Sequence, residues 1–217
     1  MAKFLLAILA VAMLVSVGVA TDADPINDYC VADLKSTVLI NGLPCKSAAT
    51  VVSSDFLFSG LRNPAAIGPL GIGITPGFAG VNYPALNTQG LSLARFDYAK
   101  GGLVPPHTHA RASEVIYVTK GEILVGFVDT AGKLFSATLK KGDVWLFPRG
   151  LVHFQLNVGG GHAASVSVLN GQNPGVQLIP SALFGSTPAI KDEVLSKGFG
   201  ISTSEVQKIK KVFQPAM

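Results

Sequence analysis

Four residues in two short segments have the types and spacing of a metal site. Residues 105–114 read PPHTHARASE and include His107, His109 and Glu114, and residues 148–155 read PRGLVHFQ and include His153. Three imidazoles and one carboxylate, without a thiolate, favour a redox-active or hard divalent ion that keeps open coordination positions. The alternative is that these are unrelated half-buried polar residues, but their clustering in a histidine-poor chain argues against it.

The spacing within each segment indicates how the chain could bring these side chains together. His107 and His109 are two residues apart, so on a strand both imidazoles lie on the same face. The proline pair before them has no backbone donors and suits the entry of a strand at a sheet edge. Glu114 follows a short bend, from which a neighbouring strand could return its carboxylate to the same point. His153 begins a later strand.

Two further polar residues could support the site. Gln155 and Asn157 share the strand face of His153 and are predicted to point into the same pocket, because a metal-bound imidazole needs a partner for its other nitrogen. The remaining histidine, His162, lies in a glycine-rich stretch, where we expect it to be solvated.

Short β-branched segments between turn residues predict an all-β core, either a sandwich or a barrel. A hairpin is expected where residues 114–118 and 123–128 flank Lys120-Gly121. Residues 63–85, rich in Gly, Pro and Ala, are expected to form a long irregular connection. The predicted strands cover residues 91–98, 114–118, 123–128, 133–139, 144–147, 153–158 and 164–169.

The C-terminal part of the chain has helical patterns instead. Thr187 is expected to cap a helix that has Pro188 at its first position, runs to about Lys197 and is stopped by Gly198. Residues 202–205 form a capping box that opens a second helix. Two short amphipathic helices shield little apolar surface alone, so we expect them to pack on a neighbouring subunit. The apolar face of the second helix comprises Val206, Ile209 and Val212 or Phe213.

The N-terminus predicts secretion. Residues 1–20 combine Lys3, an apolar run and a small-residue ending at Ala20, as in a cleaved signal peptide. A membrane anchor is the alternative, but the run is short for a span. Residues 21–217 then form a single domain with its core at about residues 60–205. The formal charge of +4 without a dense basic stripe argues against nucleic acid as a partner, although it could favour small anions or an acidic cell-wall matrix.

Two cysteines, Cys30 and Cys45, lie near the start of the predicted mature chain. In a secreted protein an even count favours a disulfide. Closing a loop of this length stabilises the fold by about 3 kcal/mol in the chain-entropy model. The alternative is a pair of buried free thiols.

Both histidine segments resemble the two cupin boxes of plant germins and germin-like proteins. Further stretches resemble germin signatures across the predicted mature chain, namely DYCVADL at 28–34, DFLF at 55–58, QNPG at 172–175 and LFGS at 183–186. One departure lies inside the first box, where Ala110 stands at a position that is usually proline; this could loosen the loop but removes no ligand.

The resemblance implies a cupin β-jelly-roll barrel with short C-terminal helices. It also implies one Mn²⁺ per subunit and a Cys30–Cys45 disulfide. The expected assembly is a homohexamer, a trimer of dimers clasped by the helices, in the apoplast or cell wall. The implied metal ligands are His107, His109, Glu114 and His153.

The family resemblance brings two activities, oxalate oxidase and superoxide dismutase. True germins place two asparagines near the metal, and the corresponding residues here are Ala94 and Val104, which cannot hydrogen-bond oxalate. We therefore predict manganese-dependent dismutation of superoxide to hydrogen peroxide. The alternative is a non-enzymatic storage, receptor or auxin-binding role, favoured if Ala94, Val104, Phe147 and Leu156 line a dry pocket.

Overall fold

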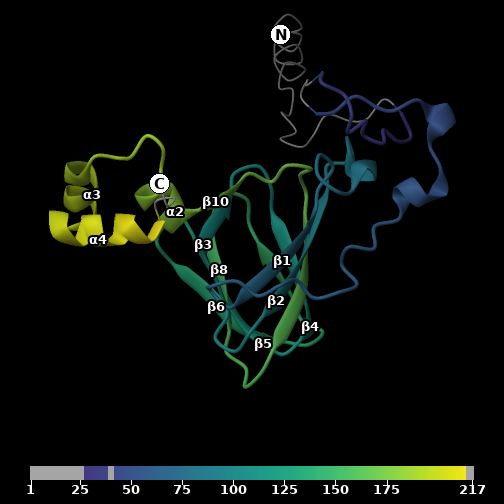
Figure 1. The fold of residues 1–217 in the computed structure, drawn as a ribbon. Helices are drawn as coiled ribbons and strands as arrows, with labels where there is room; N and C mark the ends of the chain where they lie inside the picture. Colours follow the sequence, from purple (N-terminus) through teal and green to yellow (C-terminus); the bar gives the residue numbers. More distant parts are fainter. Residues whose placement is uncertain (1–26, 39–41, 214–217) are drawn as a thin grey trace, which may run out of the picture.

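The computed structural model describes residues 27–38 and 42–213, so the predicted signal peptide lies outside the described residues. Two five-stranded antiparallel sheets face each other and form a barrel (Figure 1). In sheet order, the first sheet comprises β1 (Ile72–Gly77), β2 (Ser92–Tyr98), β9 (Ala163–Leu169), β4 (Glu114–Lys120) and β7 (Val144–Phe147). The second comprises β10 (Val176–Leu178), β3 (Leu103–His109), β8 (Val152–Asn157), β5 (Glu122–Val128) and β6 (Leu134–Lys140). The predicted all-β fold is confirmed.

Period-two patterning places one face of each strand inside the barrel. Along β4, Glu114, Ile116 and Val118 are buried, whereas Val115 and Tyr117 between them are exposed. Burial of an aliphatic side chain of this size contributes about 1.5–3 kcal/mol, so the inward rows of both sheets supply most of the stability. The fully buried core includes Tyr98, Ile116, Val118, Ile123, Val125 and Phe147.

The predicted hairpin at Lys120-Gly121 is wrong. β4 pairs with β7 and β9, whereas β5 pairs with β6 and β8, so the chain crosses from one sheet to the other at this turn. Gly121 makes the crossing possible, because its φ is 79° and a Cβ there would lie 2.6 Å from Ala163. Because of this crossing, β4 and β5 lie in facing sheets, and their apolar faces pack against each other across the core. In a hairpin they would lie side by side in one sheet.

The segment predicted as irregular, residues 63–85, contains a strand. β1 forms the edge of the first sheet and pairs with β2 from Ile72 to Gly77. Its glycines and Pro76 concealed the strand pattern; proline is tolerated there because one side of an edge strand makes no ladder. The segment ends in the short 3₁₀ helix η3 (Pro84–Leu86), and two more such helices, η1 (Ala48–Thr50) and η2 (Ser53–Phe56), precede it.

Three helices follow the barrel and lie to one side of it in Figure 1: α2 (Ile179–Phe184), α3 (Asp192–Phe199) and α4 (Thr203–Phe213). The first of the two predicted helices corresponds to α3, and its predicted start and end are wrong. It begins at Asp192, where two acidic residues favour the helix N-terminus, and ends at Phe199, followed by the capping residue Gly200, whose φ is 65°. Gly198 lies within it.

The capping box of the second helix is confirmed. Glu205 accepts from the backbone N–H of Ser202 at 2.8 Å, and the Ser202 hydroxyl accepts from the N–H of Glu205 at 3.3 Å. The helices pack on one another through Phe184, Leu195 and Val206. Packing on a neighbouring subunit stays a prediction. Within the described ranges, no helix is long and apolar enough to cross a membrane.

Candidate metal centre

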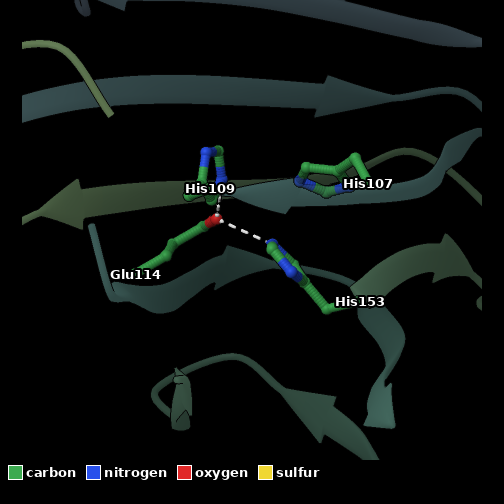
Figure 2. Close-up of side chains that lie close together, drawn as sticks. All are labelled: His107, His109, Glu114 and His153. Atoms are coloured by element: carbon green, nitrogen blue, oxygen red, sulfur yellow. Dashed lines mark hydrogen bonds and ion pairs between the residues drawn. The ribbon is translucent and has the colours of Figure 1, made fainter. Parts of the chain in front are cut away.

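The structure brings the four predicted residues to one point inside the barrel. His107 and His109 come from β3 and His153 from the adjacent β8, while Glu114 reaches in from β4 of the facing sheet. All four are buried, and one ligand atom from each lies within 4.8 Å of the others. Figure 2 shows the imidazoles and the carboxylate pointing toward a shared centre. Metal–nitrogen bonds of about 2 Å suit this spread, so the cluster could hold an ion.

The backbone of β3 fixes the two neighbouring imidazoles. His107 pairs with His153 of β8, and the register of this pairing shifts between Val104 and His107, where the two prolines lie. The prolines lie at this irregularity, and β10 covers the other side of β3 only from His107 to His109, so their place just before the covered stretch agrees with the expected strand entry at an edge. The irregularity lets Val104 face inward together with the two histidines, although Val104 and His107 are three residues apart.

Backbone carbonyls set the tautomers of two rings. His107 donates from Nδ1 to the Pro105 carbonyl at 2.9 Å, and His153 donates from Nδ1 to the Leu151 carbonyl at 2.9 Å. In its neutral form, each ring then directs an Nε2 lone pair inward. Nε2 of His153 lies 3.3 Å from Oε2 of Glu114. Two lone pairs that face each other at this distance need a cation between them, so the donor set fits a metal ion.

The carboxylate is held ionised. Burial alone would raise the pKa of Glu114, but the close approach of the His109 and His153 rings and the hydrogen bond from Ser167 outweigh it and keep the pKa well below its usual range. Burial, aided by the adjacent His153, lowers the pKa of His107 to about 4. Near neutral pH the site therefore offers an anionic carboxylate together with a neutral His107, the forms that bind metal ions.

Ser167 supports the site and is absent from the sequence-based prediction. Its hydroxyl on β9 donates to Oε1 of Glu114 at 2.6 Å, which leaves Oε2 toward the imidazoles. The signal was the alternation of Ser165 and Ser167 with valines, which puts small hydroxyls on an inward face. Phe147 also contributes, because its ring stacks on His153 with centroids 4.5 Å apart.

A cavity of about 350 Å³ adjoins the cluster. Ala94 and Val104, the two positions singled out from the sequence, both lie on its wall. Phe147 and Leu156 are not among its lining residues. Besides the three ligands His107, His109 and Glu114, the wall consists of Ile74, Pro76, Phe78, Ala94, Phe96, Val104, Leu169, Pro174, Val176 and Leu178.

The two polar candidates on β8 differ in their surroundings. Gln155 is fully buried, and neither polar atom of its side chain has a partner in the described part of the chain. Asn157 was predicted to point into the same pocket, but it donates to the carbonyls of Ala99 and Gly161 at the other end of β8. Asn157 is buried because its side chain joins these two turns, so it does not belong to the metal pocket.

The peripheral predictions also have outcomes. Cys30 and Cys45 form the expected disulfide. His162 is exposed, as predicted. The loop that carries Ala110 is tied down despite the missing proline, since Ala110 donates its N–H to the Gly175 carbonyl at 3.3 Å and the neighbouring Arg111 donates to the Asn173 carbonyl at 2.9 Å.

Comparison with known proteins agrees with this architecture. Residues 71–207 match the family model described as Cupin. The chain is 48% identical to "Germin-like protein subfamily 2 member 1" of Arabidopsis thaliana over 99% of both chains. It is 50% identical to Nectarin-1 of Nicotiana plumbaginifolia over 91% of this chain and 85% of that protein.

Among solved structures, a recombinant oxalate oxidase in complex with glycolate superposes with a TM-score of 0.86 at 39% identity, covering 89% of this chain and 98% of that one. The match spans the barrel and nearly all of the relatives' lengths. The chain therefore belongs to the cupin family and, within it, to the germin-like proteins.

Proposed function

We propose that this protein is a secreted manganese protein that dismutates superoxide to hydrogen peroxide and dioxygen in the plant apoplast. The observation that carries the proposal is the buried cluster of three imidazoles around one ionised carboxylate, open to a cavity. We assign the ligands as His107, His109, Glu114 and His153, with one Mn²⁺ per subunit. When bound, manganese would supply the one-electron redox change that dismutation requires; zinc could occupy the ligands without supplying it.

The residues of the chain set the net charge of the metal centre and fix the positions of the ligand atoms. With neutral imidazoles and one carboxylate, a divalent ion leaves the centre with a net charge of about +1, which attracts a small anion. Ser167 and the backbone acceptors of His107 and His153 fix the ligand atoms before any substrate arrives. Preorganisation of this kind avoids reorganisation during the reaction. Four ligands leave roughly two positions of an octahedral ion open.

The cavity wall argues against oxalate as substrate. Ala94 and Val104 cannot donate hydrogen bonds to it, and the adjoining wall is apolar. Burying a dianion without donors is costly, because each unmet hydrogen bond loses about 1–3 kcal/mol. Oxalate oxidation is therefore the less favoured activity. A non-enzymatic binding role, such as storage, reception or auxin binding, is the second candidate, because the same apolar wall could receive an organic ligand.

Secretion and self-assembly are part of the proposal. The Cys30–Cys45 disulfide is consistent with an oxidising compartment. The outer face of the first sheet exposes a row of apolar side chains unusual for a monomer, which supports self-association; we propose the homohexamer that the family resemblance implies. The row includes Val115, Tyr117, Val144, Leu146 and Val168. Acidic cell-wall polysaccharide remains a proposed contact, and nucleic acid and membrane are not proposed as partners.

The decisive experiment compares superoxide dismutation by three purified proteins dialysed free of loose manganese. Wild type should be active in proportion to its bound manganese, and His109→Ala should lose both metal and activity. His162→Ala is the matched control, since it removes an exposed imidazole that is not one of the proposed ligands and should behave as wild type. A fully metallated wild type without activity would reject the enzyme and favour the binding role.

A further inference from the structure

A second cavity lies between the end of β1 and the segment that joins β9 to β10. Its volume is about 410 Å³, within the range of about 300–1,000 Å³ that is typical of small-molecule sites. None of the four proposed metal ligands lines it, and Phe78 is the one described residue that lines both cavities. Its wall combines apolar side chains, among them Leu43, Phe78 and Val81, with the amide side chains of Asn87, Gln172 and Asn173.

The buried amide of Asn87 holds one side of this cavity in place. Asn87 is 1% exposed, its Nδ2 donates to the Leu43 carbonyl at 2.7 Å, and its Oδ1 accepts from the Leu43 N–H at 3.4 Å. Nδ2 also lies 3.2 Å from Sγ of Cys30, which belongs to the disulfide. Contacts within the chain therefore fix the position of Leu43, so this part of the wall is preformed.

The two other amides have their oxygens occupied and their nitrogens free. Oε1 of Gln172 accepts from the backbone N–H of Thr88 at 2.6 Å. Oδ1 of Asn173 accepts from an Nη atom of Arg111 at 2.8 Å and from the N–H of Gly175 at 3.3 Å. These bonds determine which end of each amide is the oxygen. Neither amide nitrogen makes a hydrogen bond within the described residues, so both NH2 groups can donate to a ligand.

Two backbone positions place Gln172 at the cavity. Thr88, which donates to it, has a φ of 65°, and this left-handed conformation is rare for a β-branched residue. Residues held in such conformations cluster at ligand-binding sites. Gly42 also lines the cavity, and a Cβ there would lie 3.6 Å from Nε2 of Gln172. The free NH2 group of Gln172 is therefore on the cavity side.

The composition of the wall selects the class of ligand. No ionisable side chain lines the cavity in the described part of the chain, so a charged ligand would lose solvation without gaining a counter-charge. An apolar ligand would leave both NH2 groups unpaired. A neutral sugar ring meets both conditions, because its oxygens can accept from the amides while its C–H face packs against Phe78 and Leu43.

We infer that this cavity binds a neutral saccharide unit, with its oxygens at the amides of Gln172 and Asn173 and its ring against Phe78. The site is independent of the metal cluster, because none of the proposed ligands lines it. It also differs from the proposed contact with acidic polysaccharide. That contact depends on the net charge of the protein, whereas recognition here is by shape and hydrogen bonds.

The test is saturation-transfer NMR on the full chain, titrated with the neutral methyl glycosides of glucose, galactose and xylose and with the anionic methyl glucuronide. At least one neutral glycoside should bind saturably with a Kd of about 1–10 mM, because a single sugar unit makes few contacts. The glucuronide should bind at least about fivefold more weakly than the glucoside. No saturable binding of any neutral glycoside, or tighter binding of the glucuronide, would overturn the inference.

Variants of one amide locate the binding site. Gln172→Glu keeps the oxygen that accepts from Thr88 but replaces the NH2 donor, and should weaken binding of the neutral glycoside at least about fivefold. Gln177→Glu is the matched control, because it makes the same change at an exposed glutamine of β10 that does not line the cavity. Equal affinity in these two variants would contradict the assignment.

A second variant fills the cavity. Gly80 is exposed, and a Cβ there would meet only Cδ1 of Leu43 within 4 Å, at 3.7 Å, so the position has room for a side chain. Gly80→Trp should therefore block the cavity and abolish binding, whereas Gly80→Ala should bind as wild type does. Wild-type affinity in Gly80→Trp would show that the sugar binds elsewhere.

The metal-free variant His109→Ala separates this inference from the proposed function. It should bind the glycoside with wild-type affinity, and loss of sugar binding in the folded variant would contradict an independent site. A wild type that dismutates superoxide without binding any neutral glycoside rejects this inference alone. A wild type that binds the glycoside but, fully metallated, does not dismutate superoxide rejects the proposed function alone.

Discussion

Two regions of the molecule hold a carboxylate in a hydrogen-bond network, and they compensate its negative charge differently. In the barrel, Glu114 is 1% exposed and its partners are two imidazoles and a hydroxyl. In the helical cluster, Asp192 bonds the ammonium of Lys210 at 2.6 Å, and Lys210 also donates to the Ile190 carbonyl. The helices bring their own cation, whereas the barrel surrounds its anion with imidazoles and a hydroxyl. The helical network is complete with its own cation, whereas the barrel network requires a metal ion.

Replacing the carboxylate should break this contrast most strongly. Glu114→Gln removes the anionic ligand, and we expect manganese retention to fall by more than about a hundredfold, to below detection after dialysis. Asp192→Asn, the equivalent change in the helical cluster, should keep its metal. Elemental analysis of both proteins measures the difference, and full manganese occupancy in Glu114→Gln would refute the ligand assignment.

Acid should weaken the barrel before the helices. The pKa of His107 is about 4 in the folded chain and 6.5 unfolded, so the unfolded state binds more protons between these values. Stability of the metal-free protein therefore falls as the pH drops from about 6.5 to about 4, by roughly 3 kcal/mol from this residue. The depressed pKa of Glu114 continues the loss below about 4.5.

The helical pair titrates lower. The hydrogen bond from Lys210, followed by that from Gln207, lowers the pKa of Asp192 below its usual 3.8. Its contribution is present above that value and is lost only below it. Urea unfolding of chelated protein between pH 7 and 4 should show the slope, and His107→Gln should flatten it. A slope unchanged in His107→Gln would contradict its origin.

A smaller effect is expected from the support of the carboxylate. Ser167→Ala removes the hydroxyl that holds Oε1 of Glu114 but leaves all four ligands. Outer partners of this kind typically change metal affinity by about 10–100-fold, and we expect about tenfold weaker manganese binding. Competition with a chelator measures it. Ser165→Ala, which affects the hydroxyl pair with Tyr98, is the neighbouring control.

The smallest effect belongs to the helical cluster. Lys210→Met removes the ammonium from the Ile190 carbonyl and from Asp192, while its apolar stem is kept. Loss of these two hydrogen bonds, with a net cost of about 1 kcal/mol, should raise amide exchange in α3 and α4 roughly fivefold. Manganese content should not change. Faster exchange throughout the barrel would show that the two regions are coupled after all.

The sequence anticipated the metal cluster because imidazole and carboxylate side chains are rare, and their strand spacing restricts where they point. The core strands were recognised because the alternation of apolar and polar residues is a local pattern that a single segment displays. Ser167 was missed because the alternation of serines with valines in β9 indicates an inward-facing hydroxyl but does not indicate that it contacts a metal ligand. The Lys120-Gly121 crossing was misread because strand pairing depends on the facing sheet, not on adjacent residues. The start at Asp192 was misplaced because a threonine–proline cap at 187–188 also fits a turn.

The crossing at Gly121 has a consequence for folding kinetics. It sends consecutive strands to different sheets, so β3 must find β8 and β4 must find β9 over long stretches of chain. Such high contact order slows folding. The four ligands are complete only when β3 and β8 have paired and the facing sheet has closed. We therefore expect manganese to bind late in folding, when the barrel is almost complete. The ion would stabilise the folded state and would not act as a folding nucleus.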